Sequence, residues 1–200
     1  PGPIIDPEPP DGPRIRQIVD GIPFEVVGER VQHIGADGKL ITESIRDYTR
    51  KQVSKEYSSL DTFLQHWTEA DRKHLVVKEL EEKGLFLESL QAEVGCDYDP
   101  FDLICHVAYD HPPLTRRERA ENVRKRDYFT RHGDKARAVL EALLEKYSDE
   151  GLLELENLDV LKVQPFNEIG TPIQIVQSFG GRDQYLEAVR ELEEQLYLAA

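Results

Sequence analysis

A pair of helix signals between Leu114 and Tyr147 constrains the fold of this 200-residue chain more than any other stretch. Thr115 and Glu118 have the Thr-x-x-Glu spacing of a capping box, in which the two side chains satisfy free backbone amides of a first helical turn. A helix is therefore predicted to begin there. After a break at Gly133, apolar residues recur at three- and four-residue spacing and predict a second helix with one buried face. Its apolar positions are Ala136, Val139, Leu140, Leu143, Leu144 and Tyr147.

Further helix signals lie on both sides of this pair. Capping boxes at 58–61 and 68–71 each predict a helix start. Gly84 and Gly95 follow two apolar-periodic segments at the place where a left-handed cap is needed, so each marks a predicted helix end. The Asp-Pro pair at 99–100 predicts another start, because Asp caps well and proline is tolerated in a first turn.

The C-terminal third has weaker signals. Residues 162–181 are rich in proline and glycine and are predicted to be loop-like, with a short extended piece at 173–176. A last helix is predicted over 182–198, where apolar residues occupy one side and glutamates the other.

Near the N-terminus, Asp37-Gly38 stands between two β-prone runs within 23–48, which is typical of a tight hairpin turn. Two antiparallel strands are expected. A lone hairpin is only marginally stable in water, so its apolar side must pack on the helices that follow or on a neighbouring domain. The predicted fold is mainly α: a multi-helix, bundle-like domain with an N-terminal β-hairpin.

Three regions are predicted: a linker at 1–13, a β-hairpin segment at 14–50 and a helical domain at 51–200. Six of the twelve prolines fall in the first thirteen positions, which favours an extended connector. The chain contains no methionine. We therefore expect it to be a fragment of a longer polypeptide, preceded by other domains.

Composition narrows the functional classes. A membrane location is not expected, because the sequence has no run of about 18 apolar residues and no signal-peptide pattern. We expect a cytoplasmic protein, and its two cysteines agree with a reducing compartment. The formal net charge of −14 argues against a general nucleic-acid coat, because phosphate binding depends on clustered Lys and Arg.

No set of residues with catalytic or metal-binding spacing is found. Neither of the common glycine-rich phosphate-binding patterns occurs, so no nucleotide cofactor is expected in this fragment. Cys96, Cys105, His106 and His111 match no usual zinc-ligand spacing, and Cys105 is interpreted as a core residue. A hydrolase using Cys105 and His106 is a third alternative, but adjacent helical residues point about 100° apart, which makes them a poor catalytic pair.

One segment has the opposite charge to the whole chain. Residues 116–131 contain seven Lys or Arg and three acids, a local charge of +4. One interpretation is a solvated face balanced by the acidic C-terminal helix. The other is a contact with phosphate or with an acidic partner surface. Tyr128 and Phe129 could stack on bases, although helical spacing favours a core position. The candidate binding residues are Arg116, Arg117, Arg119, Arg124, Lys125 and Arg126.

Several motifs together resemble one family. They are Leu114-Thr115-Arg116-Arg117-Glu118-Arg119, Leu140-Glu141-Ala142-Leu143-Leu144, Pro165-Phe166-Asn167, Gly170-Thr171-Pro172 and Phe179-Gly180-Gly181. With their surroundings at 43–67, 114–151 and 164–196, they resemble the C-terminal domain of the restriction, or motor, subunit of type I restriction enzymes.

The resemblance implies a parent chain with an N-terminal nuclease domain and two helicase-like motor domains that use ATP and Mg²⁺ to translocate DNA. It implies that this region docks the motor on the methyltransferase and specificity subunits, and that the catalytic residues lie upstream. The leading hypothesis is thus a non-catalytic assembly domain, which meets DNA through the whole complex. The alternative is a DNA-contact module that binds duplex phosphates through the basic helix.

Overall fold

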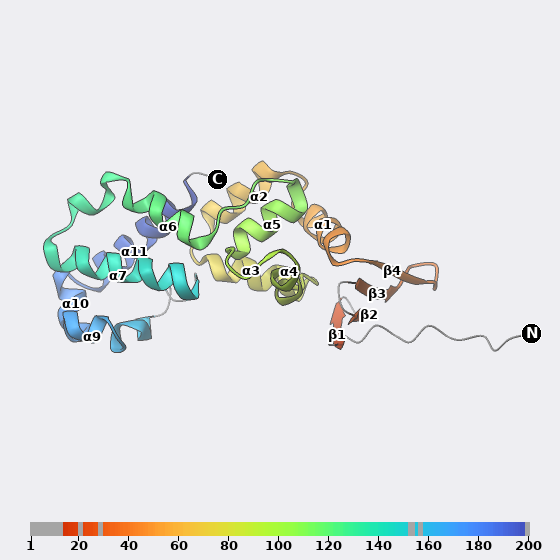
Figure 1. Cartoon of the computed structure of the whole chain (residues 1–200), viewed down its shortest axis with the longest axis horizontal. Coiled ribbons are helices and arrows are strands. Elements are labelled where there is room, and N and C mark those ends of the chain that lie inside the picture. Colours follow the sequence, from red (N-terminus) through yellow and green to blue (C-terminus); the bar gives the residue numbers. More distant parts are fainter. Residues whose placement is uncertain (1–13, 20–21, 28–29, 152–154, 156–157, 199–200) are drawn as a thin grey trace, which may run out of the picture.

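The computed structural model describes residues 14–19, 22–27, 30–151, 155 and 158–198. These residues form an elongated molecule with a small sheet at one end, a first group of helices in the middle and a second group at the other end (Figure 1). The prediction of a mainly helical fold with an N-terminal β-hairpin is confirmed, and the hairpin belongs to a larger antiparallel sheet. The predicted linker at 1–13 lies outside the described residues.

The sheet is antiparallel, and its strands are adjacent in chain order. The strands are β1 (Arg14–Val19), β2 (Ile22–Val27), β3 (Arg30–Ile34) and β4 (Leu40–Ser44). The predicted tight turn joins β3 to β4, where Gly38 has a φ of 77° and the Gly35 amide donates to the Lys39 carbonyl at 2.8 Å. The described residues thus form two strands more than the predicted pair. Short strands depend on their paired neighbours, which a local pattern does not reveal.

One face of the sheet packs on the first helix, α1 (Ile45–Glu56). Phe24, Val26 and Val31 are buried on this face. The ring of Tyr48, on α1, lies 5.2 Å from the ring of Phe24 between centroids. Among the described side chains of the strands, the buried ones all lie on this face.

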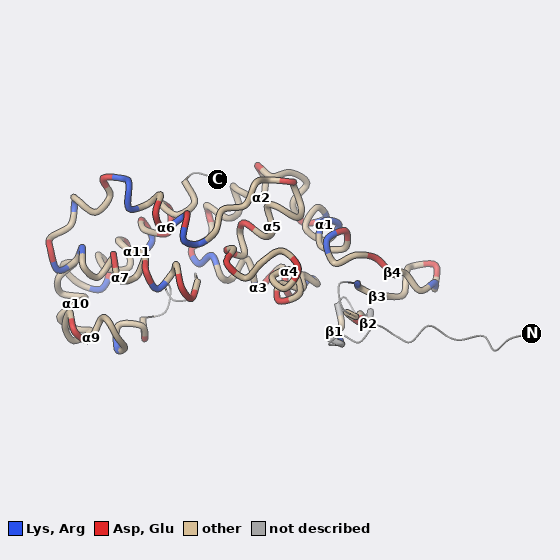
Figure 2. Tube along the Cα trace, in the orientation of Figure 1, with Lys and Arg blue, Asp and Glu red and all other residues tan. Residues whose placement is uncertain are grey.

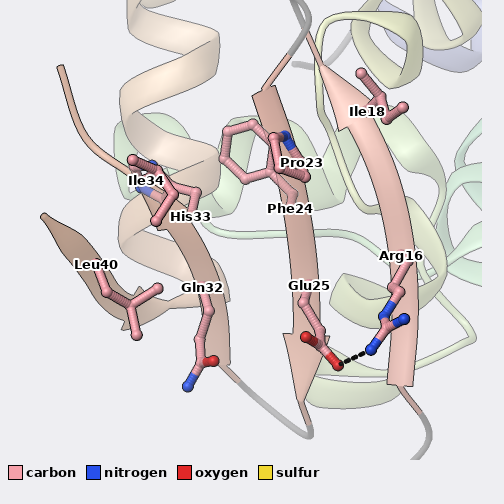
Figure 3. A pocket seen from close by; sticks show the side chains of 9 residues that line it. All are labelled: Arg16, Ile18, Pro23, Phe24, Glu25, Gln32, His33, Ile34 and Leu40. Carbon is pink, nitrogen blue, oxygen red and sulfur yellow. Dashed lines mark hydrogen bonds and ion pairs between the residues drawn. The ribbon is translucent and has the colours of Figure 1, made fainter. Parts of the chain in front are cut away.

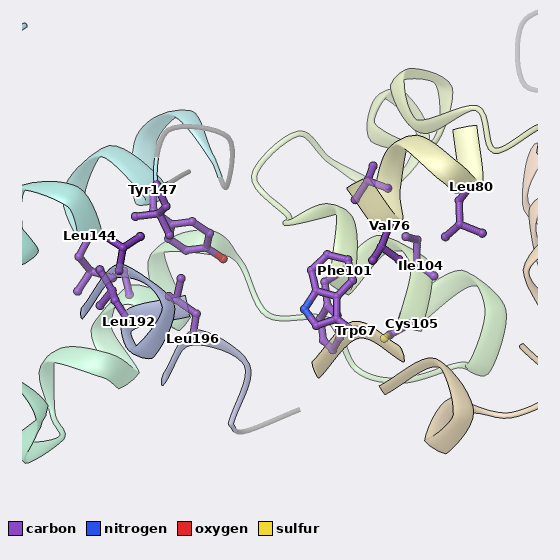
Figure 4. Packing of buried hydrophobic residues seen from close by; sticks show 14 of the residues in the cluster. Trp67, Val76, Leu80, Phe101, Ile104, Cys105, Leu144, Tyr147, Leu192 and Leu196 are labelled. Atoms are coloured by element: carbon purple, nitrogen blue, oxygen red, sulfur yellow. The ribbon is translucent and has the colours of Figure 1, made fainter. Parts of the chain in front are cut away.

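Four more helices follow α1 and complete what we call the N-terminal half. They are α2 (Leu60–Glu69), α3 (Lys73–Glu82), α4 (Leu87–Val94) and α5 (Pro100–Tyr109). Its core contains the only tryptophan, Trp67, whose ring centroid lies 5.1 Å from that of Phe101 on α5 (Figure 4).

The C-terminal half runs from α6 to α11. Its elements are α6 (Arg116–Arg124), the 3₁₀ helix η1 (Asp127–Arg131), α7 (Asp134–Glu150), the 3₁₀ helix η2 (Leu158–Lys162), α9 (Phe166–Ile169), α10 (Pro172–Ser178) and α11 (Arg182–Tyr197). All six apolar positions predicted for the second helix of the pair are buried on α7. Leu144 and Tyr147 on α7 face Leu192 and Leu196 on α11 (Figure 4).

Local helix signals were read correctly where the cap residue is unambiguous. Thr115 and Glu118 form both hydrogen bonds of the predicted capping box. Asp99 caps α5 by accepting from the Phe101 amide at 2.9 Å. Gly84 and Gly95 both have positive φ, 99° and 142°, at the ends of α3 and α4.

Two predicted starts are wrong in detail. The cap of α2 is Ser59, which accepts from the Thr62 amide at 3.2 Å, and not Ser58. The capping box at 68–71 does not form, and α3 begins at Lys73 without a side-chain cap. The Lys73 amine instead donates to the Thr68 and Ala70 carbonyls at 3.1 and 2.9 Å. It thereby satisfies carbonyls at the end of α2, which a local capping rule does not consider.

The expectation of a loop with an extended piece at 173–176 is also wrong, because this stretch is α10. Thr171 forms a capping box with Gln174, and Pro172 occupies the first turn. The β-branched residues there favoured a strand, but Ile175 is fully buried on the helix and Ile173 is 71% exposed. Within the described part of the chain, no helix is long and apolar enough to cross a membrane.

Candidate functional site

The predicted basic surface is built on α6, whose start is fixed by the Thr115 capping box. In Figure 2, Lys and Arg follow α6 and the chain beyond it. The six candidate residues do not share one environment. One is buried, two reach backbone carbonyls of other elements, one is paired with an acid, and two are open to solvent.

Arg119 is the buried member, with 1% of its surface exposed. Its Nε and Nη2 donate to both carboxylate oxygens of Asp102, on α5, at 2.5 and 2.8 Å. Its Nη1 donates to the Leu196 carbonyl at the end of α11, at 2.7 Å. The guanidinium also lies 4.9 Å from the ring centroid of Phe101 and 5.1 Å from that of Tyr197. The two-pronged geometry suits the planar arginine fork.

A second buried acid, Asp99, lies beside this pair. One of its oxygens caps α5, and the other accepts from the hydroxyls of Tyr147 and Tyr197 at 2.9 and 3.0 Å. Burial raises the pKa of Asp99 above its ordinary value. We call Asp99, Asp102, Arg119, Tyr147 and Tyr197 the clasp. It joins the start of α5 to α6, α7 and α11, and so connects the N-terminal half to the C-terminal half.

Within the clasp, Arg119 and Asp102 form a buried ion pair. Burial alone would lower the pKa of Arg119, but its hydrogen bond to Asp102 and the charge of Asp102 outweigh this effect and raise the pKa. The Leu114 amide also donates to Asp102 Oδ1, at 2.9 Å. Such a pair contributes little net stability against an apolar replacement, whereas loss of one partner is costly. The arrangement can hold two helical groups in one geometry.

Two further arginines also bridge elements. Arg116 reaches the Tyr98 and Ser148 carbonyls at 3.5 and 3.4 Å, and Arg126 donates to the Gln195 carbonyl on α11. Three of the six candidates therefore contact the protein's own backbone or buried acids.

The remaining three candidates face outward. Arg124 pairs with Glu145 on α7. Arg117 and Lys125 are exposed, and neither side chain forms an ion pair with a described residue.

Arg119 must be removed from the predicted surface, because its burial and its pairing with Asp102 exclude contact with a phosphate or a partner. Its partner lies on another helix, so the local charge pattern did not reveal the pair. One signal was present: position 119 lies one turn from Val123 and beside Ala120, and both are fully buried. Tyr128 and Phe129 are buried, which confirms their predicted core position.

The cysteines and histidines that were considered for metal binding or catalysis lie in different environments. Cys105 is fully buried, as predicted, and burial raises the pKa of its thiol, so the thiolate is disfavoured. His106 accepts from Arg46 at 3.0 Å and donates to the His111 carbonyl at 3.2 Å. Cys96 is exposed. Among the described residues, no group of three or more His, Cys, Asp or Glu is placed to hold a metal ion.

Comparison with known proteins gives two matches. Residues 43–197 match the family described as EcoEI R protein C-terminal. Over 189 residues the chain is 52% identical to a curated protein from Escherichia coli, the type I restriction enzyme EcoAI endonuclease subunit. That alignment covers 94% of this chain and 23% of the relative, so the chain spans about a quarter of the relative's length. No solved structure matches the chain.

Proposed function

Because the chain belongs to the EcoEI R protein C-terminal family and is a C-terminal domain of a type I restriction endonuclease subunit, we propose that it is a non-catalytic assembly domain. In this proposal it couples the DNA-translocating motor of its parent chain to the methyltransferase and specificity subunits. ATP and Mg²⁺ act in the motor part of the parent, outside this chain.

One observation carries the proposal: the clasp fixes two helical halves into one elongated body. A docking domain has to hold two surfaces at a set distance, and a pre-organised body does so without an ordering cost on binding. Half of the six candidate cations are used inside the protein, since Arg116, Arg119 and Arg126 contact other elements.

Calorimetry tests the proposal. The chain is titrated into an assembled complex of the cognate methyltransferase and specificity subunits, and saturable heat is expected. An unrelated protein of similar net charge serves as the control, because the charge of −14 could produce non-specific heat. Absence of heat, together with normal assembly of a parent subunit that lacks residues 14–200, would rule out the proposal.

DNA contact is the second candidate, and the exposed, unpaired side chains of Arg117 and Lys125 favour it. Two phosphate contacts predict a slope of about −1.8 in the logarithm of affinity against the logarithm of salt concentration, so binding through these two alone is weak. The double variant Arg117→Glu/Lys125→Glu should lose this binding. Binding to duplex DNA that does not depend on salt, or no binding at all, contradicts this candidate.

A further inference from the structure

The open face of the sheet carries an apolar row that crosses every strand. Ile18 on β1 pairs with Pro23 on β2, and Ile34 on β3 pairs with Leu40 on β4. The β2–β3 register places Pro23 beside Ile34. The exposed fractions of Ile18, Ile34 and Leu40 are 73%, 43% and 63%, and Pro23 is exposed as well. We call these four residues the sheet row (Figure 3).

The next row on the same face is polar. Arg16 pairs with Glu25, Glu25 with Gln32, and Gln32 with Thr42 across neighbouring strands. Arg16 Nη2 lies 3.5 Å from Glu25 Oε1 (Figure 3). A hollow of about 580 Å³ is lined by the sheet row, by three of these polar residues, and by Phe24 and His33. An apolar centre beside a polar border is the arrangement of a protein–protein interface.

The position of the sheet row is unusual for a two-faced sheet. The opposite face is already covered, because Phe24, Val26 and Val31 are buried against α1. In an antiparallel sheet with one covered face, the other face is expected to be polar. A contiguous exposed apolar strip, unlike scattered apolar residues, marks a surface that another structure covers.

We propose that the part of the parent polypeptide that precedes this 200-residue chain covers the sheet row with an apolar patch of its own. This inference rests on the proposed function only in treating the chain as the C-terminal part of a longer subunit. The family match begins at residue 43, so β1 to β3 lie on the N-terminal side of the matched region, towards the rest of the parent polypeptide. The aligned relative is much longer than this chain, which accounts for 23% of it.

Two features favour this occupant over a separate molecule. The preceding polypeptide is connected through residues 1–13 to β1, which carries Ile18, so its effective concentration at the sheet row is high. The charges of Arg16 and Glu25 offset each other, so the border selects neither an acidic nor a basic partner. A neutral, apolar protein surface fits this chemistry, whereas nucleic acid would require unpaired cations.

Hydrogen exchange in the full-length subunit, compared with the 200-residue chain alone, tests the proposal. Amides of β1 and β4 should exchange about 10-fold more slowly in the full-length subunit, because a covered sheet opens less often. The double variant Ile18→Glu/Leu40→Glu should abolish this slowing. Ile173→Glu is the matched control, since Ile173 is 71% exposed on α10, at the far end of the molecule, and should keep the slowing.

Four outcomes would overturn the proposal. The first two are equal exchange in the two proteins and slowing that persists in the double variant. Slowing in the isolated chain that grows with protein concentration would identify a second copy as the occupant. Faster exchange after removal of residues 1–13 from the isolated chain would identify that segment instead. The measurement uses the subunit without its partners, so its result is independent of the calorimetric test of assembly.

Discussion

At the scale of single residues, Arg119 has the largest predicted effect on stability. Its side chain is 1% exposed and forms an ion pair with Asp102, which is also buried. Arg119→Leu leaves the Asp102 carboxylate without its cation, so we expect a loss of about 3–5 kcal/mol in the free energy of unfolding. Urea unfolding measures this loss. Arg117→Leu is the matched control and should change the free energy by less than about 0.5 kcal/mol, because Arg117 is exposed.

The double variant Arg119→Leu/Asp102→Leu separates the pair from its parts. It removes both charges together, so it should be less destabilised than Arg119→Leu alone. A double variant that is less stable than the single one would contradict an uncompensated Asp102 charge as the cause.

Asp99 gives a pH-dependent prediction. Burial raises its folded-state pKa above the unfolded value of about 3.9, so between these two values the folded state binds more protons than the unfolded state. The contribution of Asp99 to stability is therefore present at low pH and is lost as pH rises through this window. The variant Asp99→Asn carries an amide that does not titrate, so it lacks this pH-dependent contribution.

Urea unfolding of the wild type and Asp99→Asn across this pH window tests the sign. The wild type should lose stability relative to the variant as pH rises. The difference between the two proteins is the relevant quantity, because carboxylates with lowered pKa, such as Glu79 beside Lys83, act in the opposite direction. A difference that grows in favour of the wild type as pH rises would contradict the prediction.

At the scale of elements, the start of α6 depends on its capping box. Thr115 accepts from the Glu118 amide at 3.2 Å, and Glu118 accepts from the Thr115 amide at 2.8 Å. Thr115→Ala should reduce the free energy of unfolding by about 1 kcal/mol, as measured by thermal or urea unfolding. Thr115→Ser keeps the hydroxyl and should retain most of the stability. Equal losses in both variants would show that the methyl group, and not the cap, is responsible.

The elements also show where local patterns suffice. Starts with an unambiguous cap, at Asp99 and Thr115, were predicted correctly, because the groups that decide them lie within four residues. The start of α10 was missed although Thr171, Pro172 and Gln174 form a start signal, since the isoleucines nearby suggested a strand. The extra strands were missed because strand pairing is settled by neighbours rather than by one segment.

At the scale of the whole molecule, the clasp predicts that the two halves unfold together. Trp67 reports on the N-terminal half and on the junction, since its ring lies 5.3 Å from that of Tyr197. Fluorescence of this single tryptophan and far-ultraviolet circular dichroism of all helices should therefore show coincident thermal transitions. Two separate midpoints would mean that the halves are independent units.

The sequence by itself determined the mainly helical class, the hairpin turn at Gly38 and the buried face of α7. These follow from capping, turn chemistry and apolar periodicity, which act over a few residues. The motifs also indicated the family, which the match at 43–197 confirms.

Only the tertiary structure decided where the arginines of the basic helix lie. Arg119 meets Asp102 across 17 positions, and Asp99 meets Tyr147 and Tyr197 across 48 and 98 positions. A buried ion pair forms only when the folded chain brings both charges together away from water, so no local pattern specifies it. For the same reason, pairing of all four strands created the sheet row, whose members are scattered between Ile18 and Leu40.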